Sequence, residues 1–336
     1  MNNSNSNNTS PFSLTILDFL TLLQNYIFSF NSPLMVTIGI IGNIVICLGM
    51  MQNEIKIKSN LKVYYIAIAI GDIGSLLFWH LRDFLTVGLW FLSNGKFYLY
   101  LYSTFLCKLW LSVYDQSFIL SMYTVIAYGI ERNLALYFPF KHKSLNKTKM
   151  TCLLLIICVG IPSIIQIPVM ILTADKIQIK AGQLPFCGVD SNSNFYAIGI
   201  IGVICIVMIF HPLITAILVF GIVIKINQIN YHKKELSQQT NTLSKSEMRA
   251  VLTLLTVASI NLLIFIPNAI FYSGVYLLRA ISPFSFERNL WETLARISFA
   301  LGSISHALNF FVYCIQIPSF RKFILCHSVH PSRSGL

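Results

Sequence analysis

Charged residues are scarce in this chain. Only 11% of its 336 residues are Asp, Glu, Lys or Arg, while 55% are hydrophobic and the mean hydropathy is +0.70. A soluble protein of this size has about a quarter of its residues charged. The composition therefore predicts an integral membrane protein. The net charge of +12 does not indicate nucleic-acid binding, because the basic residues gather beside the apolar runs.

Patterns typical of metal sites and enzymes are also lacking. The eight cysteines form no CxxC pair and no Cys/His cluster with metal-ligand spacing. No nucleophile–base pair is visible, so we do not expect an enzyme. Secondary transporters usually show repeated halves, broken helices and mid-membrane charge pairs. None of these is visible, and a transporter stays the alternative from another class.

Seven apolar runs are long enough to cross a bilayer, which requires about 20 helical residues. They lie at about 34–53, 62–81, 107–132, 151–172, 196–226, 249–278 and 291–316. The predicted fold is an all-α integral membrane protein, a seven-transmembrane helix bundle over 34–316. An extracellular segment (1–33) precedes it, and a short amphipathic eighth helix and cytoplasmic tail (317–336) follow. Residues 12–30 carry Asp18, Gln24 and Asn25, so we expect an interfacial or extracellular helix there instead of a span.

The third run, from Cys107 to Arg132, organises the bundle. As a helix it is about 37 Å long, enough to reach from one face of a bilayer to the other. One helical face, spaced alternately by four and three residues, carries Tyr114, Phe118, Ser121, Val125, Tyr128 and Arg132. A span with an acid, hydroxyls and aromatics on one side is expected in the middle of a bundle, away from lipid.

Charge placement sets the orientation. The segments on the Arg132 side hold 16 of the 24 Lys and Arg residues, and basic loops stay cytoplasmic. The N-terminus is therefore expected outside the cell. Its polar first residues contain N-x-S/T patterns, so we expect glycosylation at Asn2, Asn7 and Asn8.

Several motifs then fall in one order along the chain. They are Gly42-Asn43, Asp72, Cys107 with Cys187, Glu131-Arg132-Asn133, Pro212, Pro267, Asn309 to Tyr313, and Phe320 with Cys326. In this order and spacing, residues 34–326 resemble the rhodopsin-like (class A) G-protein-coupled receptors. Residues 306–314 look like those of invertebrate neuropeptide receptors of the FMRFamide or myosuppressin type. The chain departs from the family pattern at Phe220, Phe265 and Phe310, and its fourth span lacks tryptophan, so details of the family's activation rearrangement differ here.

The resemblance implies a set of roles. The expected features are a Cys107–Cys187 disulfide, lipidation of Cys326, and a sodium ion held by Asp72, Ser121, Ser305 and Asn309. Coupling to a heterotrimeric G protein is assigned to Glu131, Arg132, Glu247, Asn309 and Tyr313, and arrestin is the further partner that the resemblance implies. Within this set we expect Arg132 and Glu247 to form a latch in the resting state, with Glu131 able to hold the same arginine. No cofactor other than sodium is expected.

The ligand pocket follows from the same resemblance. Its expected lining residues are Tyr114, Asp115, Phe118, Phe265, Tyr272, Arg296 and Phe299. Amine receptors of the family place an acid where this chain has Tyr114, and opsins place a lysine where it has Ser303. The preferred prediction is therefore a plasma-membrane receptor for a short neuropeptide, with an amine or chemosensory receptor as the alternative within the family.

Overall fold

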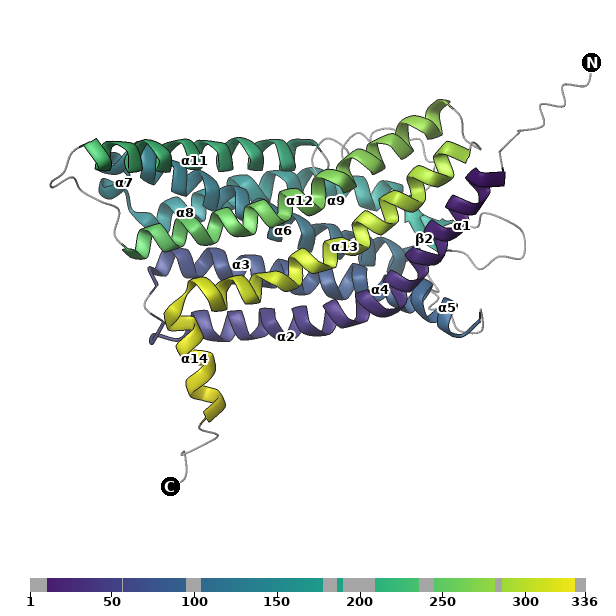
Figure 1. The fold of residues 1–336 in the computed structure, drawn as a ribbon, viewed down its shortest axis with the longest axis horizontal. Coiled ribbons are helices and arrows are strands. Elements are labelled where there is room, and N and C mark those ends of the chain that lie inside the picture. The colour runs from purple at the N-terminus through teal and green to yellow at the C-terminus, as the bar shows by residue number, and fades with distance from the viewer. Residues whose placement is uncertain are drawn as a thin grey trace, which may run out of the picture.

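The computed structural model describes residues 11–55, 57–94, 104–177, 186–189, 209–235, 245–281 and 286–329. Long helices run beside one another along the long axis of the molecule (Figure 1). Helix α14 leaves the bundle at one end, and α1 and the short strands lie at the opposite end (Figure 1). These are called the α14 end and the α1 end below.

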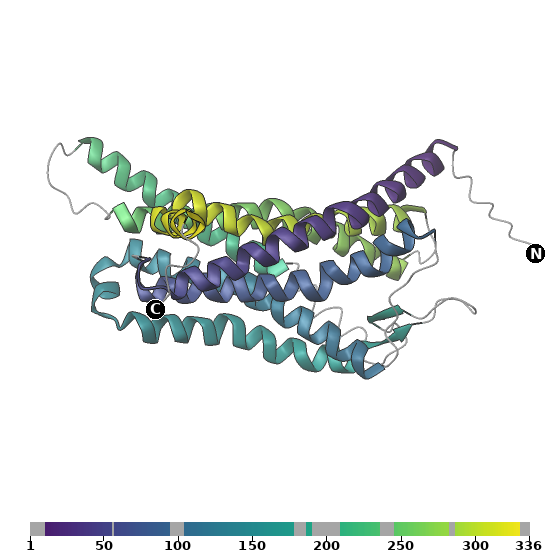
Figure 2. The same cartoon turned by 90° about the horizontal axis from the view of Figure 1, so that it is seen from below.

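The first helix is longer than the sequence predicts. It consists of α1 (Pro11–Tyr26), a π-helical turn (Ile27–Asn31) and α2 (Ser32–Met51), which continue one another. Residues 12–30 are helical as expected, but their separation from the first span is wrong, because one apolar helix runs through both. Proline has no N–H for the carbonyl four residues earlier, and the wider π turn directly before Pro33 accommodates it. In Figure 2 this helix projects beyond its neighbours at the α1 end.

The second helix also runs on past its expected end. Its parts are α3 (Ser59–Ser75), a π turn (Leu76–His80), α4 (Leu81–Asp83), a second π turn (Phe84–Gly88) and α5 (Leu89–Leu92). Trp90, which lies beyond the expected span at 62–81, is therefore helical. The two π turns lie in the half of the helix at the α1 end, and such turns are common causes of bends in long helices.

Helix α6 (Thr104–Tyr137) is the predicted third span. It contacts α3, α9, α11 and α12. Six other helices in the described part of the chain are long and apolar enough to cross a membrane, and α6 is not one of them. The reason is its content of polar side chains, which face other helices in place of lipid. The average hydropathy of a helix does not show whether its polar side chains face other helices or lipid.

The remaining elements complete the bundle. They are α7 (Pro139–Ser144), α8 (Lys147–Leu155), a π turn (Ile156–Gly160), α9 (Ile161–Thr173), β1 (Ala174–Ile177), β2 (Phe186–Val189), α11 (His211–Glu235), α12 (Lys245–Ile281), α13 (Phe286–Gln316) and α14 (Pro318–Val329). The strands pair antiparallel, with Lys176 opposite Cys187. Pro267 lies inside an uninterrupted α12. The predicted all-α seven-helix membrane fold is confirmed, and the small strand pair is an addition that the sequence did not predict.

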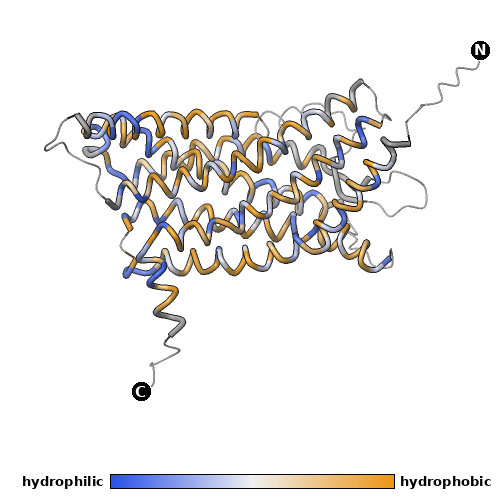
Figure 3. Tube along the Cα trace, viewed as in Figure 1, coloured by the Kyte–Doolittle hydropathy of each residue, from blue (hydrophilic) through white to orange (hydrophobic). Residues whose placement is uncertain are grey.

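The outer surfaces of the helices are apolar. Side chains such as Leu263 and Ile164 are 76% and 73% exposed, which in water is an aggregation hazard but in lipid is the favoured surroundings. Figure 3 shows hydrophobic colour along the helices and hydrophilic colour gathered at the α14 end. The polar residues inside the bundle therefore need partners on neighbouring helices.

Candidate functional site

The predicted inward face of α6 is confirmed. All six of its residues, from Tyr114 to Arg132, are at most 8% exposed. They divide into an aromatic level towards the α1 end, a middle level at Ser121, and a level at Tyr128 and Arg132 towards the α14 end. Each level contacts different helices, so α6 connects three clusters of buried side chains.

The middle cluster surrounds Asp72 of α3, whose carboxylate is completely buried. Its Oδ1 accepts a hydrogen bond from Ser121 Oγ at 2.5 Å and lies 2.7 Å from His306 Nδ1. Its Oδ2 accepts a hydrogen bond from Asn309 Nδ2 at 2.6 Å. One carboxylate thus joins α3, α6 and α13. A buried charge that keeps several hydrogen bonds is tolerated, whereas an unpaired one is costly.

Glycine makes the Asp72–Ser121 contact possible. A Cβ added at Gly71, the residue before Asp72, would lie 2.5 Å from the backbone nitrogen of Ser121. No other residue type fits this crossing without displacing α6. The close crossing of α3 and α6 brings the hydroxyl of Ser121 to the carboxylate.

The four residues expected to hold sodium are only partly gathered. Asp72, Ser121 and Asn309 are in contact, but the hydroxyl of Ser305 donates to the carbonyl of Gly302 at 2.8 Å. His306, which the sequence analysis did not assign, lies against Asp72 instead. Helical spacing gave a signal for it, because His306 is three residues before Asn309 and shares its face.

The cluster towards the α14 end surrounds Glu131, also completely buried. Its Oε1 accepts hydrogen bonds from Asn60 Nδ2 and Arg132 Nη2, both at 2.6 Å, and Oε2 accepts one from Thr151 Oγ1 at 3.3 Å. The Arg132 guanidinium lies 5.5 Å from the centre of the Tyr128 ring, a cation–π contact. Three side chains, Asn60, Thr151 and Tyr128, thus hold the predicted coupling residues Glu131 and Arg132. The sequence did not indicate that Asn60 and Thr151 would be partners of Glu131, because polar residues near helix ends are common.

His142 of α7 lies near the same carboxylate, with Nε2 3.7 Å from Glu131 Oε1. Burial, and next the charge of Arg132, lower the pKa of His142 below its ordinary value. A neutral His142 leaves Arg132 as the cation that pairs with Glu131. The ion pair is therefore local to α6.

The predicted Arg132–Glu247 latch is not formed. Arg132 pairs with Glu131, and Glu247 Oε1 lies 2.6 Å from Lys58 Nζ. The adjacent, buried Glu131 gives the guanidinium a closer partner than the first turn of α12 does. The side chains of Lys58 and Glu247 are 41% and 36% exposed, so this pair at the α14 end is a solvated one. It still spans from the start of α3 to the start of α12.

A buried hydrogen bond makes a second connection to α12. The hydroxyl of Tyr128 donates to the carbonyl oxygen of Ala250 at 2.8 Å and lies 3.1 Å from the hydroxyl of Tyr65. The ring of Tyr65 packs 4.8 Å from that of Tyr313, measured between centroids. Tyr313, an expected switch residue, is therefore part of the tyrosine cluster Tyr65, Tyr128 and Tyr313, which joins α3, α6, α12 and α13.

The aromatic level brings together most of the expected ligand-contact residues. Phe118 contacts Phe265 edge to face at 5.4 Å between centroids, and Phe299 contacts Tyr114 at 6.3 Å and Tyr272 at 6.2 Å. Two residues of the second helix that were not assigned join them. Trp79 lies 4.3 Å from Tyr114, and His80 lies 5.6 Å from Phe299. This aromatic cluster lies above Asp72 towards the α1 end.

Asp115 does not belong to that cluster. Its Oδ2 accepts a hydrogen bond from Gln166 Nε2 of α9 at 3.0 Å, and Gln166 is completely buried. The expectation that Asp115 lines the ligand pocket is corrected, because a step of one residue turns a helical side chain by about 100°. Gln166 had a usable signal as an isolated polar residue within an apolar span.

Arg296 of α13 lies at the mouth of the aromatic cluster. Its Nη2 donates to Glu292 Oε1 at 2.9 Å, and its side chain is 47% exposed. Nearby, the Arg82 guanidinium lies 5.1 Å from the Trp79 ring centre. Two guanidinium groups, that of Arg82 in α4 and that of Arg296 in α13, therefore lie near the aromatic cluster on its side towards the α1 end.

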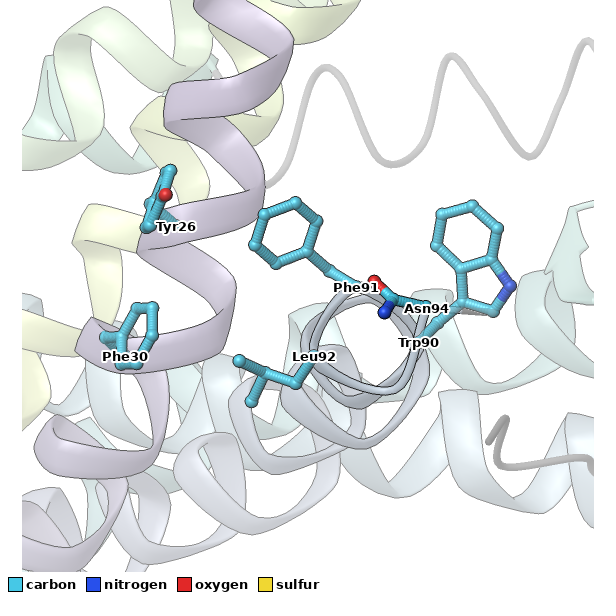
Figure 4. A pocket seen from close by; sticks show the side chains of 6 residues that line it. All are labelled: Tyr26, Phe30, Trp90, Phe91, Leu92 and Asn94. Carbon is cyan, nitrogen blue, oxygen red and sulfur yellow. The ribbon is translucent and has the colours of Figure 1, made fainter. Parts of the chain in front are cut away.

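A small cleft opens further out, between the first helix and α5. Its lining residues are Tyr26, Phe30, Trp90, Phe91, Leu92 and Asn94 (Figure 4). Tyr26 and Phe91 meet edge to face at 5.5 Å. Tyrosine and tryptophan at this level are typical of the membrane–water interface, so the cleft is explained by the aromatic belt.

The remaining site residues are placed as follows. Cys107 lies completely buried near the start of α6, and Cys187 lies in β2. Cys326 lies in α14. The glycosylation patterns at Asn2, Asn7 and Asn8 fall outside the described residues.

These clusters form a core of polar and aromatic side chains that joins several helices of the bundle. A comparison with known protein families matches residues 42–313 to the 7 transmembrane receptor (rhodopsin family). A search of curated proteins found no match. The family match covers most of the chain and begins and ends at predicted motif residues, Gly42 and Tyr313. The chain therefore belongs to the rhodopsin family of seven-transmembrane receptors.

Proposed function

We propose that this G-protein-coupled receptor binds a short extracellular peptide and activates heterotrimeric G proteins at the plasma membrane. Membership of the family makes it a multi-pass membrane receptor and not an enzyme. The part that we propose is that its ligand is a short peptide. The observation that carries it is the position of Asp115, which faces Gln166 of α9 and not the aromatic cluster.

An amine ligand needs a carboxylate partner in the pocket. With Asp115 turned away, the side chains above Asp72 are mainly aromatic rings. The charged groups at their mouth include the guanidinium groups of Arg82 and Arg296, and Glu292, which pairs with Arg296. Guanidinium groups favour carboxylate and carbonyl oxygens, which every peptide offers. Aromatic rings suit the apolar side chains of the same ligand.

Peptide activation is tested with a peptide library on cells that express the receptor and a promiscuous G protein. For an active peptide, we expect Arg296→Ala to lower potency about 10- to 100-fold, because hydrogen bonds to charged groups contribute about 1.5–3 kcal/mol. Asp115→Asn is the matched control and should leave potency nearly unchanged at equal surface density. Activation by a monoamine that depends on Asp115 would contradict the proposal.

The proposed topology places the α1 end outside the cell and the α14 end in the cytoplasm. The excess of Lys and Arg on the α14 side supports it. With this orientation Asn2, Asn7 and Asn8 are accessible for glycosylation, and Cys326 of α14 is accessible for lipidation at the inner leaflet. The G protein, and arrestin as a further proposed partner, would bind at the α14 end beside Arg132.

We also propose the Cys107–Cys187 disulfide. Cys107 is not one of the free thiols of the described residues, and α6 contacts both β1 and β2. Removing a native disulfide typically costs 2–5 kcal/mol. Cys187→Ser should therefore reduce surface expression severely, while Cys152→Ser, at an exposed free thiol, should not. Normal surface expression of Cys187→Ser, with both thiols alkylated in native receptor, would rule the bridge out.

A further inference from the structure

The contacts of Asp72 leave little room for the sodium ion that its position suggested. Its carboxylate is already met by side chains from two other helices, Ser121 of α6 and His306 and Asn309 of α13. Since a carboxylate oxygen only accepts hydrogen bonds, each of these contacts places a donor against it. Three donors lie where an ion would need direct access to the oxygens.

Two of the expected ligands also do not present a free oxygen beside Asp72. A hard cation such as sodium prefers several oxygen ligands. Ser305, one of the expected oxygens, donates to the Gly302 carbonyl, and Asn309 presents its Nδ2 to Asp72. His306 offers the carboxylate a nitrogen, Nδ1, in place of an oxygen. The residues present do not fit a sodium ion.

His306 is held firmly in this place. It is 2% exposed, and its backbone carbonyl accepts a hydrogen bond from Asn43 Nδ2 at 3.0 Å. The rings of Phe118 and Phe265 pack edge to face against its imidazole at 6.4 and 6.2 Å between centroids. The imidazole therefore has neighbours on α6 and α12 as well as its contact with Asp72 of α3.

We propose that the imidazole of His306 takes the place of a sodium ion on Asp72, so that the stability of this receptor does not depend on sodium. The inference concerns the bundle itself and holds whichever ligand the receptor binds. The His306 imidazole also connects the aromatic cluster directly to the buried Asp72 in the middle of the bundle. The same ring contacts Phe118 and Phe265 on one side and Asp72 on the other, so a rearranged aromatic cluster would move the hydrogen-bond partner of the buried acid.

The test is the thermal unfolding temperature of purified full-length receptor in sodium chloride and in choline chloride at equal ionic strength. Wild type should unfold within about 1 °C in the two salts. His306→Ser removes one of the two partners of Asp72 Oδ1 and adds an oxygen, so the unfolding temperature of this variant should rise by about 2–5 °C in sodium, as expected for a bound ligand. Adding Asp72→Asn to that variant should remove the rise.

Two results would overturn the proposal. One is specific stabilisation of wild type by sodium that Asp72→Asn abolishes, because sodium would then bind beside His306. The other is a His306→Ser receptor that stays indifferent to sodium, because the imidazole would then not occupy the place of an ion. If the serine variant fails to fold, His306→Asn, which also offers an oxygen, is measured and read in the same way.

Discussion

Replacing Glu131 by Gln is expected to raise basal exchange, the rate of nucleotide exchange on the G protein without agonist, by about tenfold or more. Glu131 is completely buried and supplies the carboxylate that pairs with Arg132. Removing one partner of a buried ion pair costs about 3–5 kcal/mol, mostly because the other charge is left unpaired. The unpaired guanidinium then has a lower free energy nearer the α14 end, where the G protein is proposed to bind. Each 1.4 kcal/mol of such a shift changes the population tenfold.

The matched control is Glu54→Gln, the same chemical change at an exposed position between α2 and α3, which should leave basal exchange unchanged. Glu247→Gln should have an effect of about fivefold at most, because exposed ion pairs contribute up to about 1 kcal/mol. Exchange is measured at equal receptor density. A Glu131→Gln receptor as silent as wild type, with Glu247→Gln the more active, would restore the latch expected from the sequence.

Tyr128→Phe is expected to raise basal exchange several-fold without lowering expression. The change removes one buried hydroxyl, which donates to the Ala250 carbonyl of α12 and lies against the Tyr65 hydroxyl. Leaving a buried polar group without a partner costs about 1–3 kcal/mol. Phe keeps the ring and its packing against the Arg132 guanidinium, so the cost falls on the contact between α6 and α12.

Tyr137→Phe provides a control of the same type. The hydroxyl of Tyr137 also donates from α6 to a backbone carbonyl, that of Gly221 in α11, at 2.9 Å. Tyr137→Phe therefore removes a hydrogen bond between a tyrosine hydroxyl and a backbone carbonyl that does not involve α12. Equal effects of the two variants on basal exchange would show that the contact with α12 has no special role.

Much of the fold was predictable from local sequence. The apolar runs gave seven spans, and the four–three spacing in the third gave the buried face of α6. The continuous first helix was missed, because the polar residues Asp18, Gln24 and Asn25 separated residues 12–30 from the first span, whereas a π turn joins the two. The helical position of Trp90 was missed for a similar reason, since two π turns extend the second helix beyond its expected end.

The candidate site was predictable within each helix but less so between helices. Asp72, Ser121 and Asn309 were named from motif positions, and the structure brings them together. Partners such as Gln166 for Asp115, or Lys58 for Glu247, depend on the rotation of neighbouring helices, which one sequence does not specify. His306 is an intermediate case: the sequence shows which face of its helix it shares, but its contact with Asp72 depends on how α3 and α13 pack.

In the ligand-free receptor, contacts at the α14 end hold α3, α6 and α12 together. The most direct measurement is the distance between nitroxide labels at Lys58→Cys and Glu247→Cys by pulsed electron paramagnetic resonance, with exposed Cys152 replaced by Ser. One short distance is expected in the ligand-free receptor, and a longer one with nucleotide-free G protein bound. Glu131→Gln or Tyr128→Phe should populate the longer distance without G protein. An unchanged short distance in the G-protein complex would show that these contacts do not hold the helices in the resting state.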